Sequence, residues 1–191
     1  MAVDEQRPLP VGVAARAVAR CVITSARLLA SGRITLPVSH RGMRLRFGDG
    51  TESWVYRETA LRPVASRDPC VLVVGFRLRL VRGRGHRWFR AESLLNTPLF
   101  AGFPGLVSKL WMAHDENGCY RGVYEWDGPG RAEDYARALW RVLQLVSVPG
   151  SIGYRVVPGL RLRDLLADPG LLGGRSSPNP ADWWRPVVVL P

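Results

Sequence analysis

A lysine and a tryptophan lie two residues apart near the middle of the sequence, at Lys109 and Trp111. Residues two apart in a strand project from the same face. A second apolar run places Tyr124 on one face with Gly122, whose missing side chain leaves room for a flat ligand or a close-packed ring. An aromatic wall with one cation suits a planar phenol, because a nearby positive charge lowers the phenol pKa. The phenolate could pass an electron to oxygen without a cofactor, so Lys109, Trp111 and Tyr124 are candidate catalytic residues.

The same residues also allow a structural interpretation. Trp111, Tyr124 and Trp126 could be aromatic residues of the core or of an interface between two subunits. Lys109 could be a solvated strand residue, or could form an ion pair with Glu125. Under the chemical interpretation Trp126, two residues beyond Tyr124, is a candidate substrate-binding residue.

A basic segment, residues 77–90, contains six arginines and no acidic residue. Arg77 and Arg79 could bind a carboxylate or phosphate of a substrate, with His86 available for stacking. A solvated basic loop would have the same composition. Neither His86 nor His114 has a second group at a meaningful spacing, so neither stands out as a catalytic base.

The strands and helices that would position these residues follow a regular order. Alternating apolar residues predict a strand over residues 70–81, and the later segments are predicted as a short helix over 86–96, strands over 106–113 and 119–126, a helix over 131–145 and a strand over 152–157. This β-α-β-β-α-β order is the split βαβ pattern of a ferredoxin-like α+β domain.

The residues on either side of this domain are predicted to be extensions, which gives boundaries at 1–66, 69–159 and 160–191. Residues 11–30 have the spacing of an amphipathic helix that covers a core, or that docks on a partner or a membrane surface. Its expected buried side comprises Val11, Ala14, Val18, Cys21, Val22, Leu28 and Leu29. Asp49-Gly50 predicts a β-hairpin after this helix. The C-terminal tail, rich in Trp and Val, is expected to dock on the core or on a partner subunit.

Arginine dominates the charge of this chain of 191 residues, which has a formal net charge of +11. Among its 27 basic residues Lys109 is the single lysine. Nucleic acid is a disfavoured partner because the positive charge is spread along the sequence. Three distant cysteines without a CxxC pair indicate neither disulfides nor a zinc site, and they favour the cytoplasm. We expect no metal, no signal peptide and no transmembrane segment.

Two runs resemble strands of a known family. Phe103-Pro104-Gly105 leads into Lys109-Leu110-Trp111, and Gly122-Val123-Tyr124-Glu125-Trp126 follows. Their order and spacing resemble the YdhR-type mono-oxygenases of the dimeric α/β-barrel superfamily. The resemblance implies a four-stranded antiparallel sheet, two helices on one face and a homodimer that pairs the sheets into a barrel. Some relatives are cofactor-independent oxygenases of aromatic polyketides, and the resemblance makes Asn96 a candidate catalytic amide. Haem degradation is disfavoured, because residues 131–145 lack the axial histidine of that branch.

Three functions therefore remain open from the sequence. The first is a cofactor-independent mono-oxygenase, or related tailoring enzyme, for a planar phenolic substrate. The second is a non-enzymatic dimeric binding or scaffold protein that contacts a partner through residues 11–30 or the tail. The third is binding of nucleic acid or anionic lipid through the arginines of residues 77–90.

Overall fold

A computed structural model describes residues 7–62, 66–79, 85, 97–173 and 177–190 of the chain. Its elements, in chain order, are α1 (Val11–Ala30), β1 (Ile34–Thr35), β2 (Arg44–Phe47), β3 (Glu52–Leu61), β4 (Pro69–Arg77), η1 (Thr97–Leu99), β5 (Leu106–Met112), β6 (Cys119–Asp127), α3 (Pro129–Leu143), β7 (Gly153–Pro158), α4 (Leu162–Ala167), η2 (Pro169–Leu172), η3 (Pro180–Asp182) and β8 (Pro186–Leu190).

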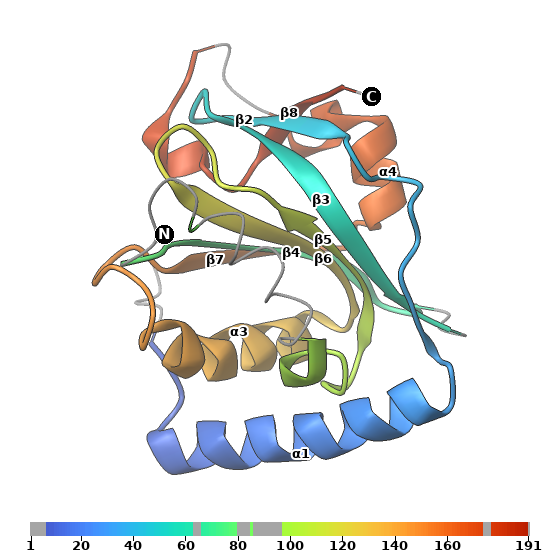
Figure 1. Cartoon of the computed structure of the whole chain (residues 1–191). Coiled ribbons are helices and arrows are strands. Elements are labelled where there is room, and N and C mark those ends of the chain that lie inside the picture. The colour runs from blue at the N-terminus through green and yellow to red at the C-terminus, as the bar shows by residue number, and fades with distance from the viewer. Residues whose placement is uncertain (1–6, 63–65, 80–84, 86–96, 174–176, 191) are drawn as a thin grey trace.

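The strands of the described residues form one curled antiparallel sheet (Figure 1). Its order is β7-β4-β6-β5-β3-β2-β8, with the short β1 paired to β3. The part β7-β4-β6-β5 is the strand order of the split βαβ pattern, which confirms the predicted α+β class. The helix predicted for residues 86–96 lies outside the described residues.

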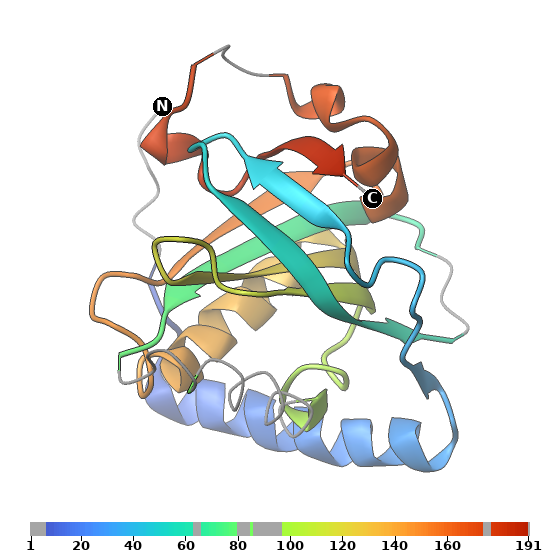
Figure 2. The same cartoon turned by 45° about the horizontal axis from the view of Figure 1, so that its top comes forward.

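The predicted N-terminal hairpin and C-terminal tail both continue this sheet. The hairpin of β2 and β3 joins it where β3 pairs with β5, and Thr59 lies opposite Lys109. The tail adds β8 to the far side of β2, with Leu45 opposite Val189. Figure 2 shows β2 and β8 side by side, in front of the central strands. The tail therefore docks on its own chain.

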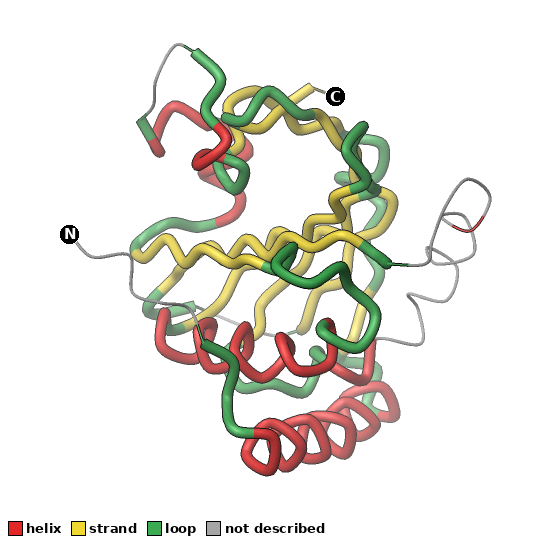
Figure 3. The backbone as a smooth tube through the Cα atoms, turned by 90° about the vertical axis from the view of Figure 1, so that its left-hand side faces the viewer, coloured by secondary structure: helices red, strands yellow, loops and turns green. Residues whose placement is uncertain are grey.

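One face of the sheet is covered by two layers of helix. Figure 3 shows α3 directly against the sheet and α1 outside it. Tyr135 and Ala136 of α3 are buried against Cys70, Leu72 and other apolar residues of the sheet. α3 begins earlier than predicted, at Pro129, because proline is well accommodated in the first turn of a helix.

α1 has its predicted ends, but a narrower buried side than expected. Ala14, Cys21 and Ser25 are its buried residues. The Cys21 and Ser25 side chains donate to the carbonyl oxygen of Pro98, at 3.2 and 3.0 Å. A side chain at Gly102 would clash with the backbone of α1, so this glycine allows the close approach. Three residues expected on the buried side, Val11, Val22 and Leu29, are exposed because only a thin stripe of the helix contacts the protein.

The other face of the sheet is covered by the chain's own later residues. Val71 and Val73 of β4 pack there with Leu162 and Leu165 of α4, among other apolar residues. Trp183 lies over Gly75 and Gly153, two glycines on neighbouring strands. A Cβ atom at Gly75 would lie 2.6 Å from the Trp183 ring, so the absence of a side chain is what admits the indole.

A buried ion-pair network fixes the turns and the tail on this same side. The Arg121 guanidinium donates to Asp115 at 2.6 Å and to Asp49 at 2.9 Å. It also donates to the Thr51 hydroxyl and to the backbone oxygen of Trp183. Because each carboxylate belongs to a different hairpin turn, one side chain of β6 holds two turns and the tail together.

Substitution of Gly75 by alanine tests the packing of the tail. We expect Gly75→Ala to lower the free energy of unfolding by about 1–3 kcal/mol, because the added methyl group overlaps the Trp183 ring. Gly130→Ala is the matched control, since its added methyl group meets nothing within 4 Å and a helix favours alanine. Denaturant unfolding of both variants would measure this difference. Equal midpoints would contradict the assigned position of Trp183.

Candidate functional site

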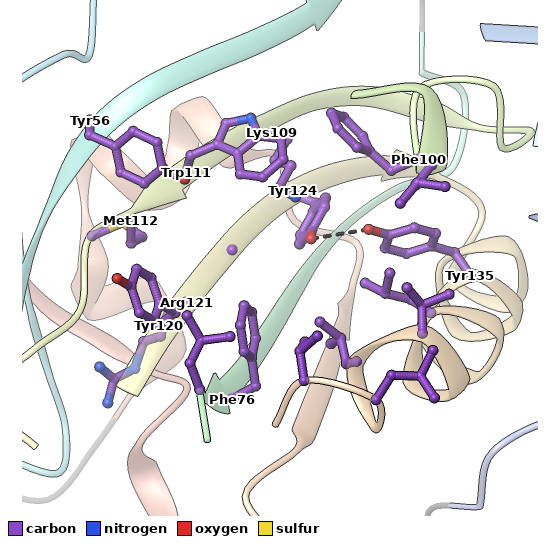
Figure 4. Close-up of a pocket in the computed structure, with 18 of the residues that line it drawn as sticks. Tyr56, Phe76, Phe100, Lys109, Trp111, Met112, Tyr120, Arg121, Tyr124 and Tyr135 are labelled. Atoms are coloured by element: carbon purple, nitrogen blue, oxygen red, sulfur yellow. Dashed lines mark hydrogen bonds between the residues drawn. The ribbon is translucent and has the colours of Figure 1, made fainter. Parts of the chain in front are cut away.

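A cavity of about 700 Å³ lies between the helix-covered face of the sheet and α3 (Figure 4). Its walls are mostly aromatic and aliphatic. The aromatic residues that line it are Tyr56, Phe76, Phe100, Trp111, Tyr120, Tyr124 and Tyr135. The cationic side chains among the lining residues are Lys109, Arg79 and Arg121, of which Arg121 directs its guanidinium into the network on the other face. Among the described lining residues there is no carboxylate.

Lys109 and Trp111 project from the same face of β5 into this cavity, as predicted. Lys109 Nζ lies 3.3 Å from the centre of the Trp111 ring and 4.4 Å from that of Phe100. The centre of the Tyr124 ring is 4.7 Å away. The Trp111 indole N–H donates to the Thr59 hydroxyl at 3.1 Å, and this bond fixes the ring against the lysine.

A second cation, Arg57 of β3, reaches the same indole. Its Cζ atom lies 4.0 Å from the centre of the Trp111 ring. The pairing of β3 with β5 places Arg57 opposite Trp111 and Thr59 opposite Lys109. The hairpin, in which the sequence indicated no chemistry, therefore supplies both the second cation and the hydrogen-bond acceptor that orients the indole.

Burial and the neighbouring Arg57 lower the pKa of Lys109 well below that of an ordinary lysine, with burial the larger cause. The rings around the ammonium act in the opposite direction. Cation–π attraction favours the charged form, but the loss of hydration on burial is the larger effect. The net result is a side chain that supplies the neutral amine at a lower pH than a surface lysine does.

Two tyrosines line the cavity beside Lys109, with Tyr124 opposite it on the neighbouring strand β6 and Tyr135 on α3. The Tyr135 hydroxyl donates to the Tyr124 hydroxyl at 3.1 Å, which leaves the Tyr124 proton available to a ligand (Figure 4). Burial raises the pKa of Tyr124 and of Tyr135, so both hydroxyls stay protonated at neutral pH. A Cβ atom at Gly122 would lie 2.7 Å from the Tyr124 ring. The Tyr124 ring therefore fills the space at Gly122, so this glycine makes room for a close-packed ring of the chain and not for a ligand.

The structure brings together Lys109, Trp111 and Tyr124, and it places Arg79 at the same cavity. Arg77 is exposed and does not line the cavity. Trp126 is fully buried, with its ring centre 4.9 Å from that of Tyr135, and it does not line the cavity either.

The expected alternative of a Lys109–Glu125 ion pair is wrong, because Glu125 points to the other face of the sheet. There it accepts a hydrogen bond from the backbone N–H of Leu162 at 3.0 Å and approaches Arg161. His114 lies in the turn before β6, where its Nδ1 is 3.0 Å from the Asp115 backbone oxygen. Asn96 and His86 lie outside the described residues.

Several residues of the site carried no recognisable signal in the sequence. Tyr56, Arg57 and Thr59 belong to a hairpin whose pairing partner could not be read from its own residues. Tyr135 lies within the helix predicted over residues 131–145, where nothing in the spacing showed that its hydroxyl would face Tyr124. Period-two alternation could have placed Tyr120 on the same face of β6 as Gly122 and Tyr124.

In the part of the chain that the structure describes, no group of three or more His, Cys, Asp or Glu side chains could hold a metal ion. None of the helices described is long and apolar enough to cross a membrane. The three cysteines have free thiols.

Comparison with known proteins gives two structural neighbours. No family model matches the sequence, and no curated protein matches it. One neighbour is an uncharacterised ferredoxin-fold protein from Listeria monocytogenes related to antibiotic-biosynthesis mono-oxygenases, with 15% identity, a TM-score of 0.39, and coverage of 57% of this chain and 64% of the other. The second is a mono-oxygenase-like protein from Listeria innocua, with 15% identity, a TM-score of 0.39, and coverage of 58% and 66%.

The chain thus spans just under two thirds of each neighbour's length. At this identity and TM-score the likeness carries no argument, and membership of the YdhR group stays a prediction.

Replacement of Lys109 tests the buried amine through stability. Between the lowered pKa and about 10.4 the unfolded state binds a proton that the folded state lacks, so stability rises with pH by up to about 1.4 kcal/mol per unit. We expect Lys109→Met to be more stable than the wild type at pH 6–7 and to lose this part of the slope. Denaturant unfolding between about pH 6 and 9.5, below the titration of tyrosine, measures both effects.

Asp134→Asn on the exposed side of α3 is the control for a general change of charge. It should keep the wild-type dependence on pH over the same range. Parallel curves for the wild type and Lys109→Met would show that Lys109 has an ordinary pKa.

Proposed function

We propose that the chain binds a planar phenolic molecule in the cavity beside α3 and oxidises it with molecular oxygen, as a cofactor-independent mono-oxygenase. The observation that carries this proposal is the buried Lys109 amine among aromatic rings at an otherwise largely apolar cavity of about 700 Å³. Such a cavity has the size of a site for a small molecule of several rings.

Lys109 acts as the base in this reaction. Its neutral amine accepts the proton of the phenol, and the phenolate is then held beside the new ammonium group and near Arg57, the second cation at Trp111. The electrostatic attraction is strong because the aromatic walls exclude water. The role differs from the one expected from the sequence, in which a permanent positive charge lowers the phenol pKa.

The electron-rich phenolate is the reductant, and oxygen is the oxidant. Transfer of one electron to oxygen and recombination of the two radicals form a carbon–oxygen bond and give a hydroperoxide. Loss of water from the hydroperoxide then leaves a carbonyl group at that carbon, and the two hydrogen atoms lost are the phenol proton and the hydrogen on the ring carbon. The overall change is RH₂ + O₂ → R=O + H₂O, which balances without a metal or an organic cofactor.

Labelled oxygen gives the most direct test. Hydroxynaphthalenes, naphthohydroquinones and hydroxyanthrones would be incubated with the protein under ¹⁸O₂, with product mass and oxygen uptake compared to a protein-free control. We expect enzyme-dependent incorporation of one ¹⁸O atom into a bound substrate. Lys109→Met should lower the rate by about 100-fold or more, because general base catalysis contributes about 10²–10⁴-fold.

Two further variants separate binding from chemistry. Val142→Phe adds bulk to the cavity wall from α3, so it should weaken substrate binding while Lys109 is kept. Asp134→Asn, on the outer side of the same helix, should leave binding and rate unchanged. Tight binding by fluorescence without oxygen uptake for any member of the panel would remove the oxygenase and leave a binding protein.

A partner-binding protein is the second candidate, and the outer side of α1 favours it. Val11 and Ile23 are 67% and 55% exposed on a helix without any acidic residue. The tail no longer supports this candidate, since β8 pairs with the same chain. Nucleic-acid binding through residues 77–90 stays a prediction, because that segment lies mostly outside the described residues.

The homodimer expected from the resemblance also stays a prediction. Sheets of that superfamily pair through the face opposite the helices. In this chain β2, β8, α4 and Trp183 cover that face. A dimer would therefore use another surface, such as the exposed side of α1, unless these elements moved away.

A further inference from the structure

Lysine and arginine are used very unequally in this chain. Of 27 basic residues, 26 are arginine, and the single lysine is the buried Lys109. A general bias toward arginine explains why the surface cations are arginines, because lysine and arginine both provide a solvated positive charge there. At Lys109 a guanidinium could not replace the amine chemically, because arginine stays protonated and is not a nucleophile, whereas lysine becomes one when it loses its proton.

We propose that Lys109 is a nucleophile that forms an imine with the carbonyl group of an aromatic aldehyde or ketone bound in the cavity. This reaction goes beyond the oxidation proposed above, because it needs neither a phenol nor oxygen. It makes the cavity a site for covalent, reversible capture of aryl carbonyl compounds.

The walls of the cavity fit this class of ligand. Lys109 Nζ is surrounded by the rings of Trp111, Phe100 and Tyr124, at 3.3, 4.4 and 4.7 Å from their centres. An aromatic ring that entered the cavity could pack against these rings and bring an attached carbonyl carbon to the amine. A small hydrophilic aldehyde would gain little from such walls.

The charged and titratable groups around Lys109 favour the neutral amine. Arg57 faces it from β3, and Arg79 lies beyond the end of β4 at the same cavity. The hydroxyls of Tyr124 and Tyr135 face the cavity from β6 and α3 and are neutral. No carboxylate among the described residues lines the cavity, so none of them holds a proton on the amine.

The covalent step uses only the amine and the carbonyl compound. The nitrogen lone pair attacks the carbonyl carbon, the π electrons move to oxygen, and a proton passes from nitrogen to that oxygen to give a carbinolamine. The carbon–oxygen bond then breaks, hydroxide takes the second nitrogen proton and leaves as water, and a C=N bond forms. Amine and carbonyl thus give imine and water, with no oxidant or reductant.

Tyr124 is placed to assist by hydrogen bonding. Its hydroxyl accepts from Tyr135, so its own proton can be donated to the carbonyl oxygen as negative charge develops there. The raised pKa of Tyr124 means that this proton stays on the tyrosine and acts as a hydrogen bond. The apolar lining favours release of water from the site once the imine has formed.

Reductive trapping on the full-length protein tests the inference. The protein would be incubated at pH 7 with 2-naphthaldehyde and sodium cyanoborohydride, which converts an imine into a stable secondary amine. Intact mass and peptide mapping then locate the label. We expect saturable labelling of Lys109, because it is the single lysine and the other amine is the N-terminus.

The N-terminal amine is an internal control for plain aldehyde reactivity. With glycolaldehyde in place of 2-naphthaldehyde, labelling of Lys109 should fall by about tenfold or more relative to the N-terminus, since about 1.4 kcal/mol of ring packing corresponds to tenfold. Lys109→Arg should remove the label, Val142→Phe should slow it, and Asp134→Asn should leave it unchanged.

The results distinguish this inference from the proposed oxidation. If 2-naphthol binds in the cavity and 2-naphthaldehyde labels only the N-terminus, the imine is wrong and the oxidation is unaffected. If Lys109 is labelled and no phenol causes oxygen uptake, the imine is supported and the oxidation is wrong. Equal labelling of Lys109 in the wild type and Val142→Phe would show reaction without the cavity and overturn the inference, as would failure of both aromatic probes to bind.

Discussion

The pairing of β3 with β5 is the interaction on which the rest of this structure depends. It places Arg57 and Thr59 beside Trp111 and Lys109, which completes the site on the helix-covered face. It also carries β2, and through β2 the tail, over the opposite face. The edge strand β3 thus both builds the cavity and brings β2 and β8 over the opposite face of the sheet. The hairpin of β2 and β3 is therefore an integral part of the domain that contains the cavity.

The buried Lys109 lowers the stability of the fold, and this cost indicates that the amine has a function. A buried lysine without a carboxylate in the described lining lowers stability whenever it is charged. A methionine of similar shape would pack against the same rings without this cost. Trp111, held by its hydrogen bond to Thr59, and Tyr124 fix the position of the amine. The simplest physical reason for a lysine at this position is therefore its chemistry.

The sequence predicted local structure better than long-range pairing. Period-two alternation found the strands and placed Lys109 with Trp111 and Tyr124 with Gly122 on single faces, because these depend on neighbours along the chain. It could not show that β3 pairs with β5, so Arg57 was missed. It also paired Lys109 with Glu125 as one alternative, although the two belong to opposite faces, because the relative register of two strands is not visible in either one.

The pairing of the early strand β2 with β8 has a consequence for folding. Arg44 lies opposite Leu190, so the sheet closes between residues separated by most of the sequence. Such distant pairing is slow, because a long loop must be closed before any contact forms. During synthesis on the ribosome, the face of the sheet opposite α3 would stay exposed until Trp183 and β8 had left the ribosome. Exposure to chaperones and to aggregation is therefore greatest before β8 becomes available for pairing.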